Sequence, residues 1–306
     1  MPLFGSHLSI AGGMVNALTL AESLRLDTVQ VFTKNQQQWK VRPLDPGAVR
    51  DWMTELGRLG WGDRTVSHAS YLINLASPDD ELWAKSVDLM TVEIERCAEL
   101  SIPYLVHHPG AYTTSTPARG LARIARAYKT LLKRTAGMRV TLCLEDTVGS
   151  GSNLGRTFEE LARLREMILE RAPSPERVGF CLDTCHAHSG GYDMSDRASA
   201  EAALDLFDET CGLSNLHVVH LNDSKVPFDS RKDRHEHIGQ GTIGRPPGPS
   251  GKASRKALKE TGFAAVVNRA ELADRPMIME TPKGEDEQGR SYDAQNLRRL
   301  RSLVGR

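Results

Sequence analysis

The sequence lacks an excess of either charge and lacks any paired cysteine motif. Its 306 residues carry 39 basic and 39 acidic side chains. Proteins that coat nucleic acid are usually basic overall, so this balance argues against that class, although it leaves room for an enzyme that touches a few phosphates with a local basic patch. Without a CxxC pair we expect reduced thiols, as in cytoplasmic proteins, rather than a disulfide framework. The five cysteines are Cys97, Cys143, Cys181, Cys185 and Cys211.

Long apolar runs and domain linkers are missing as well. No run of about 18 or more apolar residues occurs, so we expect no membrane span. The start, MPLFGSHLSIAGG, lacks the basic and apolar stretches of a signal peptide. The one Pro/Gly-rich segment, residues 245–251, indicates a surface loop rather than a linker. The sequence therefore predicts a soluble cytoplasmic protein with a single domain over residues 1–306, since α/β barrels of roughly 250 residues are commonly single units.

Short β-rich segments alternate with longer segments of helical pattern. Eight strands, each followed by a helix, predict a closed parallel (β/α)8 barrel, a TIM barrel, more strongly than an open sheet. The predicted strands cover residues 3–7, 28–33, 64–68, 104–108, 139–145, 177–183, 216–221 and 277–281. The clearest amphipathic stretches between them are residues 79–100, 117–134, 157–171 and 198–211.

Most of the predicted strands end in a side chain that can ligate a metal ion. Two positions earlier each of them carries a small or apolar residue, and side chains two apart point to the same face of a strand. If the apolar residue fills the barrel interior, the polar one lies at the C-terminal mouth, where active sites of this fold are found. The polar strand ends are His7, His68, His108, Glu145, Asp183, His220 and Glu280, and their apolar partners are Gly5, Val66, Val106, Cys143, Cys181, Val218 and Ile278.

A single histidine in such a place is more often a hydrogen-bonded structural residue than a ligand. Seven strand ends directed at one place change that balance, because a buried carboxylate or imidazole costs several kcal/mol unless it is paired or bound to a metal. The strand ends offer few lysines or arginines to neutralise Glu145, Asp183 and Glu280. We therefore predict divalent ions in the mouth. The mixed nitrogen and oxygen ligands suit zinc, and manganese and iron also accept them.

Two short clusters add further candidate ligands. FCLDTCHAHSGGYD (180–193) places His186 three residues after Asp183, and DRHEH (233–237) supplies Asp233 and His235. Each cluster alone is a weak signal. We interpret the neighbouring His188 and His237 as solvated loop residues, and Cys181 and Cys185 as non-ligands, since Cys181 has the parity of a core residue.

Taken together, these segments resemble the endonuclease IV family of apurinic/apyrimidinic (AP) endonucleases. The resemblance covers nearly the whole chain, because its motifs follow one another in the expected order from residue 5 to about residue 282. The matching motifs are FTKNQQQW (32–39), HASYLINL (68–75), HHPG (107–110), LEDTVGSGSNLG (144–155), DTCHAHSGGYD (183–193), HLNDSK (220–225), DRHEHIGQGTIG (233–244) and METP (279–282).

The resemblance implies three bound divalent ions, most commonly zinc, with manganese as an alternative at one or more sites. The first ion would be held by His68, His108 and Glu145. The second ion would be held by Glu145, which bridges the two ions, together with Asp183, His220 and Glu280. The third ion would be held by His186, Asp233 and His235. All nine positions carry the expected residue type. The resemblance does not place His7 among the ligands, so we expect it behind them or facing a DNA phosphate.

The reaction that the resemblance implies is hydrolysis of the phosphodiester 5′ to an abasic site in duplex DNA. It leaves a 3′-hydroxyl and a 5′-deoxyribose phosphate. We hypothesise that Glu145 and Glu280 are the catalytic carboxylates: Glu145 bridges two ions, and Glu280 orients the hydroxide that attacks phosphorus. The third ion would stabilise the leaving oxygen. Removal of 3′-blocking groups is an expected side activity, and a monomer is the expected assembly.

The DNA contacts are expected on loops around the mouth. Tyr71 and Leu72 follow a ligand directly, and such an aromatic–apolar pair can wedge into a base stack, although it can equally pack its loop against a helix. Two departures stand out: Gln37 lies where the motif commonly carries arginine, and the segment at about 245–276 is longer than expected, as a surface elaboration or as part of the DNA track. The remaining expected contacts are Lys34, Asn35, Lys225, Arg231, Lys232 and Arg234.

Two other functions stay open at this point. A metal-dependent sugar isomerase can use the same barrel with carboxylate and histidine ligands, but would bind fewer ions and need no wedging loop. A catalytically silent binder of abasic DNA would have no need of a bridging carboxylate such as Glu145.

Overall fold

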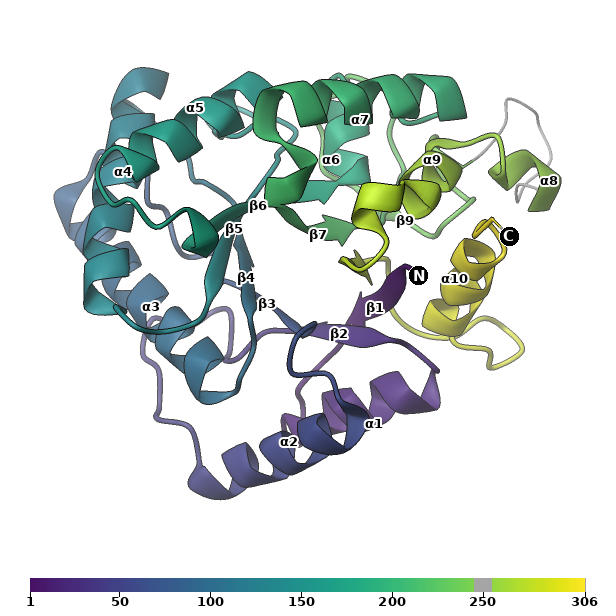
Figure 1. Cartoon of the computed structure of the whole chain (residues 1–306), viewed down its shortest axis with the longest axis horizontal. Coiled ribbons are helices and arrows are strands. Elements are labelled where there is room, and N and C mark those ends of the chain that lie inside the picture. The colour runs from purple at the N-terminus through teal and green to yellow at the C-terminus, as the bar shows by residue number, and fades with distance from the viewer. Residues whose placement is uncertain (245–254, 306) are drawn as a thin grey trace.

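The strands form a closed barrel of eight parallel strands, as predicted (Figure 1). The computed structural model describes residues 1–244 and 255–305. The order around the barrel is β1-β10-β7-β6-β5-β4-β3-β2, and every neighbouring pair is parallel. The strands are β1 (Leu3–His7), β2 (Thr28–Val31), β3 (Val66–His68), β4 (Tyr104–His107), β5 (Thr141–Glu145), β6 (Val178–Asp183), β7 (Leu216–His220) and β10 (Pro276–Met279).

Helices surround the barrel and pack on its outer face (Figure 1). The four amphipathic stretches correspond to α3 (Asp80–Glu99), α4 (Pro117–Arg134), α5 (Phe158–Leu169) and α7 (Arg197–Cys211). Each begins after an Asp or Thr whose side chain accepts a hydrogen bond from a backbone amide of the first turn, the usual stabilising cap. The other helices are α1 (Val15–Ser23), α2 (Pro46–Leu59), α6 (Thr184–Gly190), α8 (Arg255–Leu258), α9 (Gly262–Asn268) and α10 (Tyr292–Arg301).

The barrel interior contains the apolar side chains that the strand parity predicts. They form a small buried cluster separate from the larger core between strands and helices. Gly5 completes this layer without a side chain: a Cβ there would lie 2.7 Å from both Ile278 Cδ1 and Thr28 Cγ2. The interior is therefore filled, and the polar strand ends lie above it. The cluster consists of Val66, Val106, Cys143, Cys181, Val218 and Ile278.

The segment before the last strand of the barrel is only partly a loop. Residues 245–254, which include the Pro/Gly-rich stretch, lie outside the described residues. From residue 262 the chain forms α9, whose residues Gly262–Val267 are buried and which packs beside α7. This part of the segment is thus a barrel helix, not a surface elaboration. None of the described helices is long and apolar enough to cross a membrane.

A short antiparallel pair that the sequence did not predict lies beyond the barrel. β8 (Asp223–Ser224) follows β7 directly, and β9 (His235–Glu236) pairs with it. The pairing brings the DRHEH segment back beside the end of β7. Two ligand candidates that lie well beyond β7 in the sequence, Asp233 and His235, therefore reach the mouth.

Candidate metal centre

The carboxylate of Glu145, at the end of β5, lies between four imidazoles. Its Oε2 is 3.1 Å from His68 Nε2 and 3.3 Å from His108 Nε2. Its Oε1 is 2.9 Å from His220 Nδ1 and 3.4 Å from His186 Nδ1. Glu145 is fully buried, whereas the His108 side chain is 34% exposed. One oxygen thus faces the β3 and β4 side of the mouth and the other faces the β6 and β7 side.

A second group of ligand atoms surrounds His220 at the end of β7. Its Nδ1 lies 3.3 Å from Glu280 Oε2 and 3.8 Å from Asp183 Oδ2. Together with Glu145, these side chains place four ligand atoms within 4.8 Å of one another. Glu280 follows β10 by one residue, as His108 follows β4, so both side chains stand just above the rim.

The third group joins α6 to the β8–β9 pair. Asp233 Oδ2 lies 3.2 Å from His186 Nε2, and Asp233 Oδ1 lies 3.3 Å from His235 Nε2. Asp183 Oδ2 is 3.5 Å from the same His235 nitrogen, so this group touches the second one. Asp183 also caps α6, because its Oδ1 accepts from the amides of Cys185 and His186.

The electrostatics of the centre reflect tightly opposed charges. Burial by itself raises the pKa of Glu145, but the imidazoles of His220 and His108 outweigh it and hold this pKa well below its ordinary value. Burial disfavours charge on His220, yet Glu280 and Glu145 raise its pKa to about 9. The pKa of Asp233 falls to about 2 despite burial, because His186 donates to it. In the metal-free protein, the raised pKa values of His220 and His186 thus favour protonated imidazoles beside these carboxylates.

The donor set fits divalent cations. Three groups of imidazole nitrogens and carboxylate oxygens overlap, and they match zinc chemistry. The buried Nε2 of His235 lacks a hydrogen-bond partner among the described residues, as expected of a nitrogen atom that binds a metal ion. Its opposite nitrogen, Nδ1, lies 3.3 Å from the carbonyl of Glu280. Such support behind a ligand fixes the ring and is typical of metal-binding histidines.

Two cysteines also come within reach of these groups. Cys181 lies near Glu145 and His220, and the sulfur of Cys185 lies near Asp233 and His235. Burial, reinforced by the charge of Asp183, raises the pKa of Cys185 to about 12. Burial and Glu145 also raise the pKa of Cys181 well above its ordinary value. Both thiols are thus protonated in the absence of an ion, and that neither cysteine binds metal stays a prediction.

The interpretation of two histidines as solvated loop residues is wrong. His188 is 2% exposed, and Met194 N donates to its Nδ1. His237 is 8% exposed, stacks on Tyr292 at 4.3 Å and accepts from Asn296. Both are buried and hydrogen-bonded, because His188 lies in α6 and His237 lies in a loop that packs against α10 through Tyr292 and Asn296.

His7 lies behind the ligands rather than on the surface. Its Nδ1 is 3.2 Å from Glu280 Oε1, and its ring packs against Phe32 at 4.2 Å. Its Nε2 is buried. This position supports the expectation that His7 lies behind the ligands. The alternative was a contact with a DNA phosphate, and the conformation gives it no support.

Two buried amides support the ligands and were missed by the sequence reasoning. Gln30, in the middle of β2, bonds to both His220 and Glu280. Asn222 donates to Asp183 Oδ2 and accepts from the Glu280 amide. The prediction took only His, Asp and Glu as ligands, because amides rarely bind these metals, and it therefore omitted both residues. The alternation of side chains along β2 could have indicated Gln30, because Thr28 and Gln30 both point into the barrel interior. A buried amide in that place requires hydrogen-bond partners.

Tyr71 stands over the first group of ligands. Its side chain is 63% exposed, and its ring lies 5.3 Å from His68 and 6.0 Å from His108. The neighbouring Leu72 is half-buried against the core. Tyr71 is thus exposed beside the first ligand group, whereas Leu72 partly follows the packing alternative.

The 33–40 loop presents some of its expected DNA contacts and hides another. Asn35 and Gln37 are exposed, and the Gln37 amide donates to Asn35 Oδ1. Lys34 turns inward: its ammonium donates to the carbonyls of Asn35 and Gln38 and lies 3.9 Å from Glu93. In this conformation the Lys34 ammonium stabilises the loop and does not point into solvent, where it could contact a phosphate.

The basic residues after β8 are mostly at the surface. Lys225, Lys232 and Arg234 are exposed, and they flank the third group of ligands. Arg231 is half-buried and pairs with Asp229 at 2.7 Å. Three of these four cations are therefore available to a polyanion that approaches the mouth.

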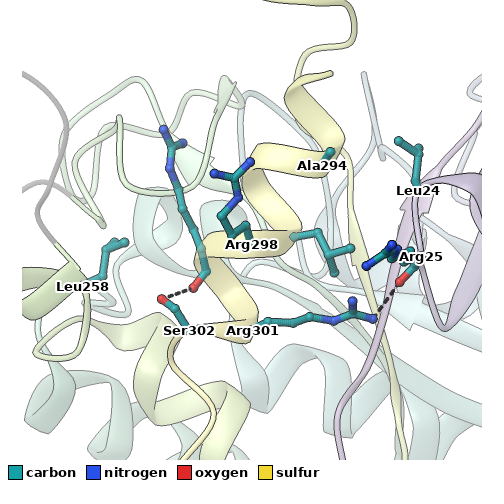
Figure 2. A pocket seen from close by; sticks show the side chains of 9 residues that line it. Leu24, Arg25, Leu258, Ala294, Arg298, Arg301 and Ser302 are labelled. Carbon is teal, nitrogen blue, oxygen red and sulfur yellow. Dashed lines mark hydrogen bonds between the residues drawn. The ribbon is translucent and has the colours of Figure 1, made fainter. Parts of the chain in front are cut away.

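A separate groove of about 650 Å³ lies along α10 (Figure 2). Arg301 donates to the carbonyl of Arg25, and the apolar residues that line the groove include Leu24 and Leu258, at its opposite sides, and Ala294. None of the described residues that line it is a His, Cys, Asp or Glu. The groove therefore has no part in the metal centre.

The barrel and the three overlapping groups at its mouth define the class: an α/β-barrel enzyme that works with divalent metal ions. A family model described as a xylose isomerase-like TIM barrel matches residues 18–302. A D-tagatose 3-epimerase-like protein shares the fold with a TM-score of 0.67, but at 17% identity over 98% of this chain and 96% of that chain it shows the fold alone.

Closer relatives narrow the class. A probable endonuclease 4 from Chloroflexus aurantiacus is 45% identical over 304 residues, which is 99% of each chain. One from Methanosphaerula palustris is 36% identical over 306 residues, again 99% of each. The crystal structure of endonuclease IV from Thermus thermophilus matches with a TM-score of 0.80 at 36% identity, covering 99% of this chain and 98% of that one. The chain belongs to the endonuclease IV family and is a metal-dependent endonuclease.

Proposed function

We propose that this protein hydrolyses the phosphodiester 5′ to abasic sites in duplex DNA, leaving a 3′-hydroxyl and a 5′-deoxyribose phosphate, as a step of base excision repair. The observation that carries the proposal is the Glu145 carboxylate, whose two oxygens face imidazoles of different ligand groups. That arrangement suits a bridge between cations. We further propose a single-domain monomer that acts on DNA in the cytoplasm and also removes 3′-blocking groups.

The proposed centre holds three divalent ions, with zinc expected first and manganese as the alternative. His68, His108 and Glu145 would hold one, and the second would lie among Glu145, Asp183, His220 and Glu280. His186, Asp233 and His235 would hold the third, for which Asp183 also comes within reach. When bound, such ions offset the charge of a phosphodiester and lower the pKa of water, so that a nucleophile exists at neutral pH.

The protein's own side chains supply orientation around that charge. Glu280 is held by Gln30 through Oε1, so its Oε2 points toward the middle of the centre, where it can orient the attacking water. Asp183 is fixed by its hydrogen bonds with α6 and Asn222. We assign no covalent intermediate and no nucleophilic Ser or Cys.

Recognition of the lesion would begin at Tyr71. Its exposed ring lies beside the ligands, where it can stack against DNA bases at a kink, with Leu72 as its neighbour in the sequence. An abasic nucleotide lacks the stacking of its base, so flipping it toward the centre costs less than flipping an intact one. Lys225, Lys232 and Arg234 would contact phosphates alongside.

A sugar isomerase is the second candidate, because the xylose isomerase-like description covers such enzymes and an epimerase-like protein shares the fold. It would turn over aldoses or ketoses and leave DNA intact. A silent DNA binder would bind an abasic duplex without cutting it.

A duplex oligonucleotide with one tetrahydrofuran abasic analogue tests the proposal. We expect one incision, immediately 5′ of the analogue, and its loss in Glu145→Gln. The matched control is Glu236→Gln in β9, a carboxylate that accepts from the His237 amide and lies outside the ligand groups. Intact duplex at stoichiometric enzyme, with zinc and manganese supplied, would refute the proposal.

A further inference from the structure

Gln30 makes three hydrogen bonds inside the barrel mouth. Its Oε1 lies 2.9 Å from His220 Nε2, and its Nε2 lies 2.6 Å from Glu280 Oε1 and 2.9 Å from His7 Nδ1. A carboxylate oxygen can only accept, which fixes the amide orientation: the NH2 group faces Glu280 and the carbonyl oxygen faces His220. Gln30 is fully buried, so water does not compete for these bonds.

His220 is supported differently from three other candidate ligands. His68, His186 and His235 each turn Nδ1 toward a backbone carbonyl, of Ala69, Asp146 and Glu280 respectively. Their Nε2 atoms face the carboxylates. His220 has the opposite orientation: Nδ1 faces Glu145 and Glu280, while Nε2 has only the side chain of Gln30 as its hydrogen-bond partner in the described part of the chain.

We propose that Gln30 is a positioning residue that sets the tautomer and ring orientation of His220, and so controls how tightly the second ligand group binds a divalent ion. The amide oxygen accepts from Nε2–H, which leaves the lone pair on Nδ1 for the ion. The same amide holds Glu280 Oε1, so one side chain aligns two ligands of one group. The inference rests on the proposed metal centre and extends it to a residue that touches no ion.

The Gln30→Met variant tests the proposal. Methionine has a similar length, but it can neither accept from His220 Nε2 nor donate to Glu280. Thr28→Val is the matched control, because Thr28 lies on the same face of β2, is buried, and bonds to the Arg64 carbonyl instead of a ligand. Zinc affinity would be measured by competition with a chromophoric chelator, beginning from metal-free protein.

We expect Gln30→Met to bind one zinc ion about 10–100-fold more weakly than the wild type, the usual effect of losing a partner behind a ligand, while its other ions are retained. Thr28→Val should match the wild type. Equal affinity of all ions in Gln30→Met would overturn the inference. The measurement uses no DNA, so it stands apart from the incision assay: failure to cut abasic DNA would refute the proposed function alone.

A spectroscopic measurement on the unmodified enzyme covers the case in which Gln30→Met does not fold. In the zinc-loaded wild type, ¹⁵N shifts of His220 should show a protonated Nε2 and a metal-bound Nδ1. Coordination of His220 through Nε2 would contradict the assignment.

Discussion

Four imidazoles lie within 3.4 Å of the Glu145 carboxylate, and this crowding decides the charge state of single residues. Burial opposes charge on His68, His186 and His220. Nevertheless, neighbouring carboxylates raise the pKa of His220 to about 9 and the pKa of His186 well above its ordinary value. In the metal-free protein at pH 7 these imidazoles therefore carry protons that a metal ion must displace.

Metal binding should consequently release protons. The sign follows from the raised pKa values: below about pH 9 His220 is protonated without metal, and zinc requires its neutral form. Apparent zinc affinity should thus rise as pH increases from 6 toward 9. Calorimetric titration at pH 7 in two buffers of different ionisation enthalpy measures the protons released. An observed heat that is independent of the buffer would contradict the account.

At the scale of elements, the strands show what could be predicted and why. Alternation along β5 predicted both the buried Cys143 and the Glu145 at its end, because strand parity is a local property of the sequence. In β2 the same alternation points Gln30 into the centre, but the strand ends at Val31 rather than residue 33, and a prediction restricted to strand-end ligands omitted Gln30. Parity predicts where a side chain points, but not which distant partner it meets.

Loops were predicted less well than strands. The β8–β9 pair, which places His235, depends on contacts between two short segments that carry no periodic signal. For the same reason His188 and His237 could not be recognised as buried, since their partners are Met194 and Asn296 on other segments. The strand ends and the two short clusters predicted the nine candidate ligands and the resemblance assigned them to three ions, but neither revealed how the loop holds them.

Asp223 is the anchor of the loop that follows β9. Its buried carboxylate accepts from the backbone amides of Ser224 and of residues 239, 240, 241, 243 and 244. Asp223→Ala would remove the acceptor of all these amides, and only the amide of residue 240 keeps another one, the His237 carbonyl, so we expect the free energy of unfolding to fall by at least about 2 kcal/mol. Urea denaturation of the metal-free protein measures it.

Asp229→Ala, in the segment between β8 and β9, is the comparison variant. Asp229 is half-exposed and pairs with Arg231, and such surface pairs contribute less than about 1 kcal/mol. If Asp223→Ala were no less stable than Asp229→Ala, the anchoring role of Asp223 would be wrong.

At the scale of the whole molecule, the barrel brings residues from distant parts of the sequence to one mouth. The parallel strands all end at the same mouth of the barrel. His68, at the end of β3, and Glu280, just after β10, are far apart in the sequence, yet both lie close to Glu145. Family membership and geometry thus converge on a metal-dependent nuclease.

The metal content of the purified protein tests the central claim most directly. After dialysis against zinc and then against metal-free buffer, elemental analysis should find three ions per chain, one for each ligand group. One ion per chain, or none, would contradict the account of a three-ion centre bridged by Glu145.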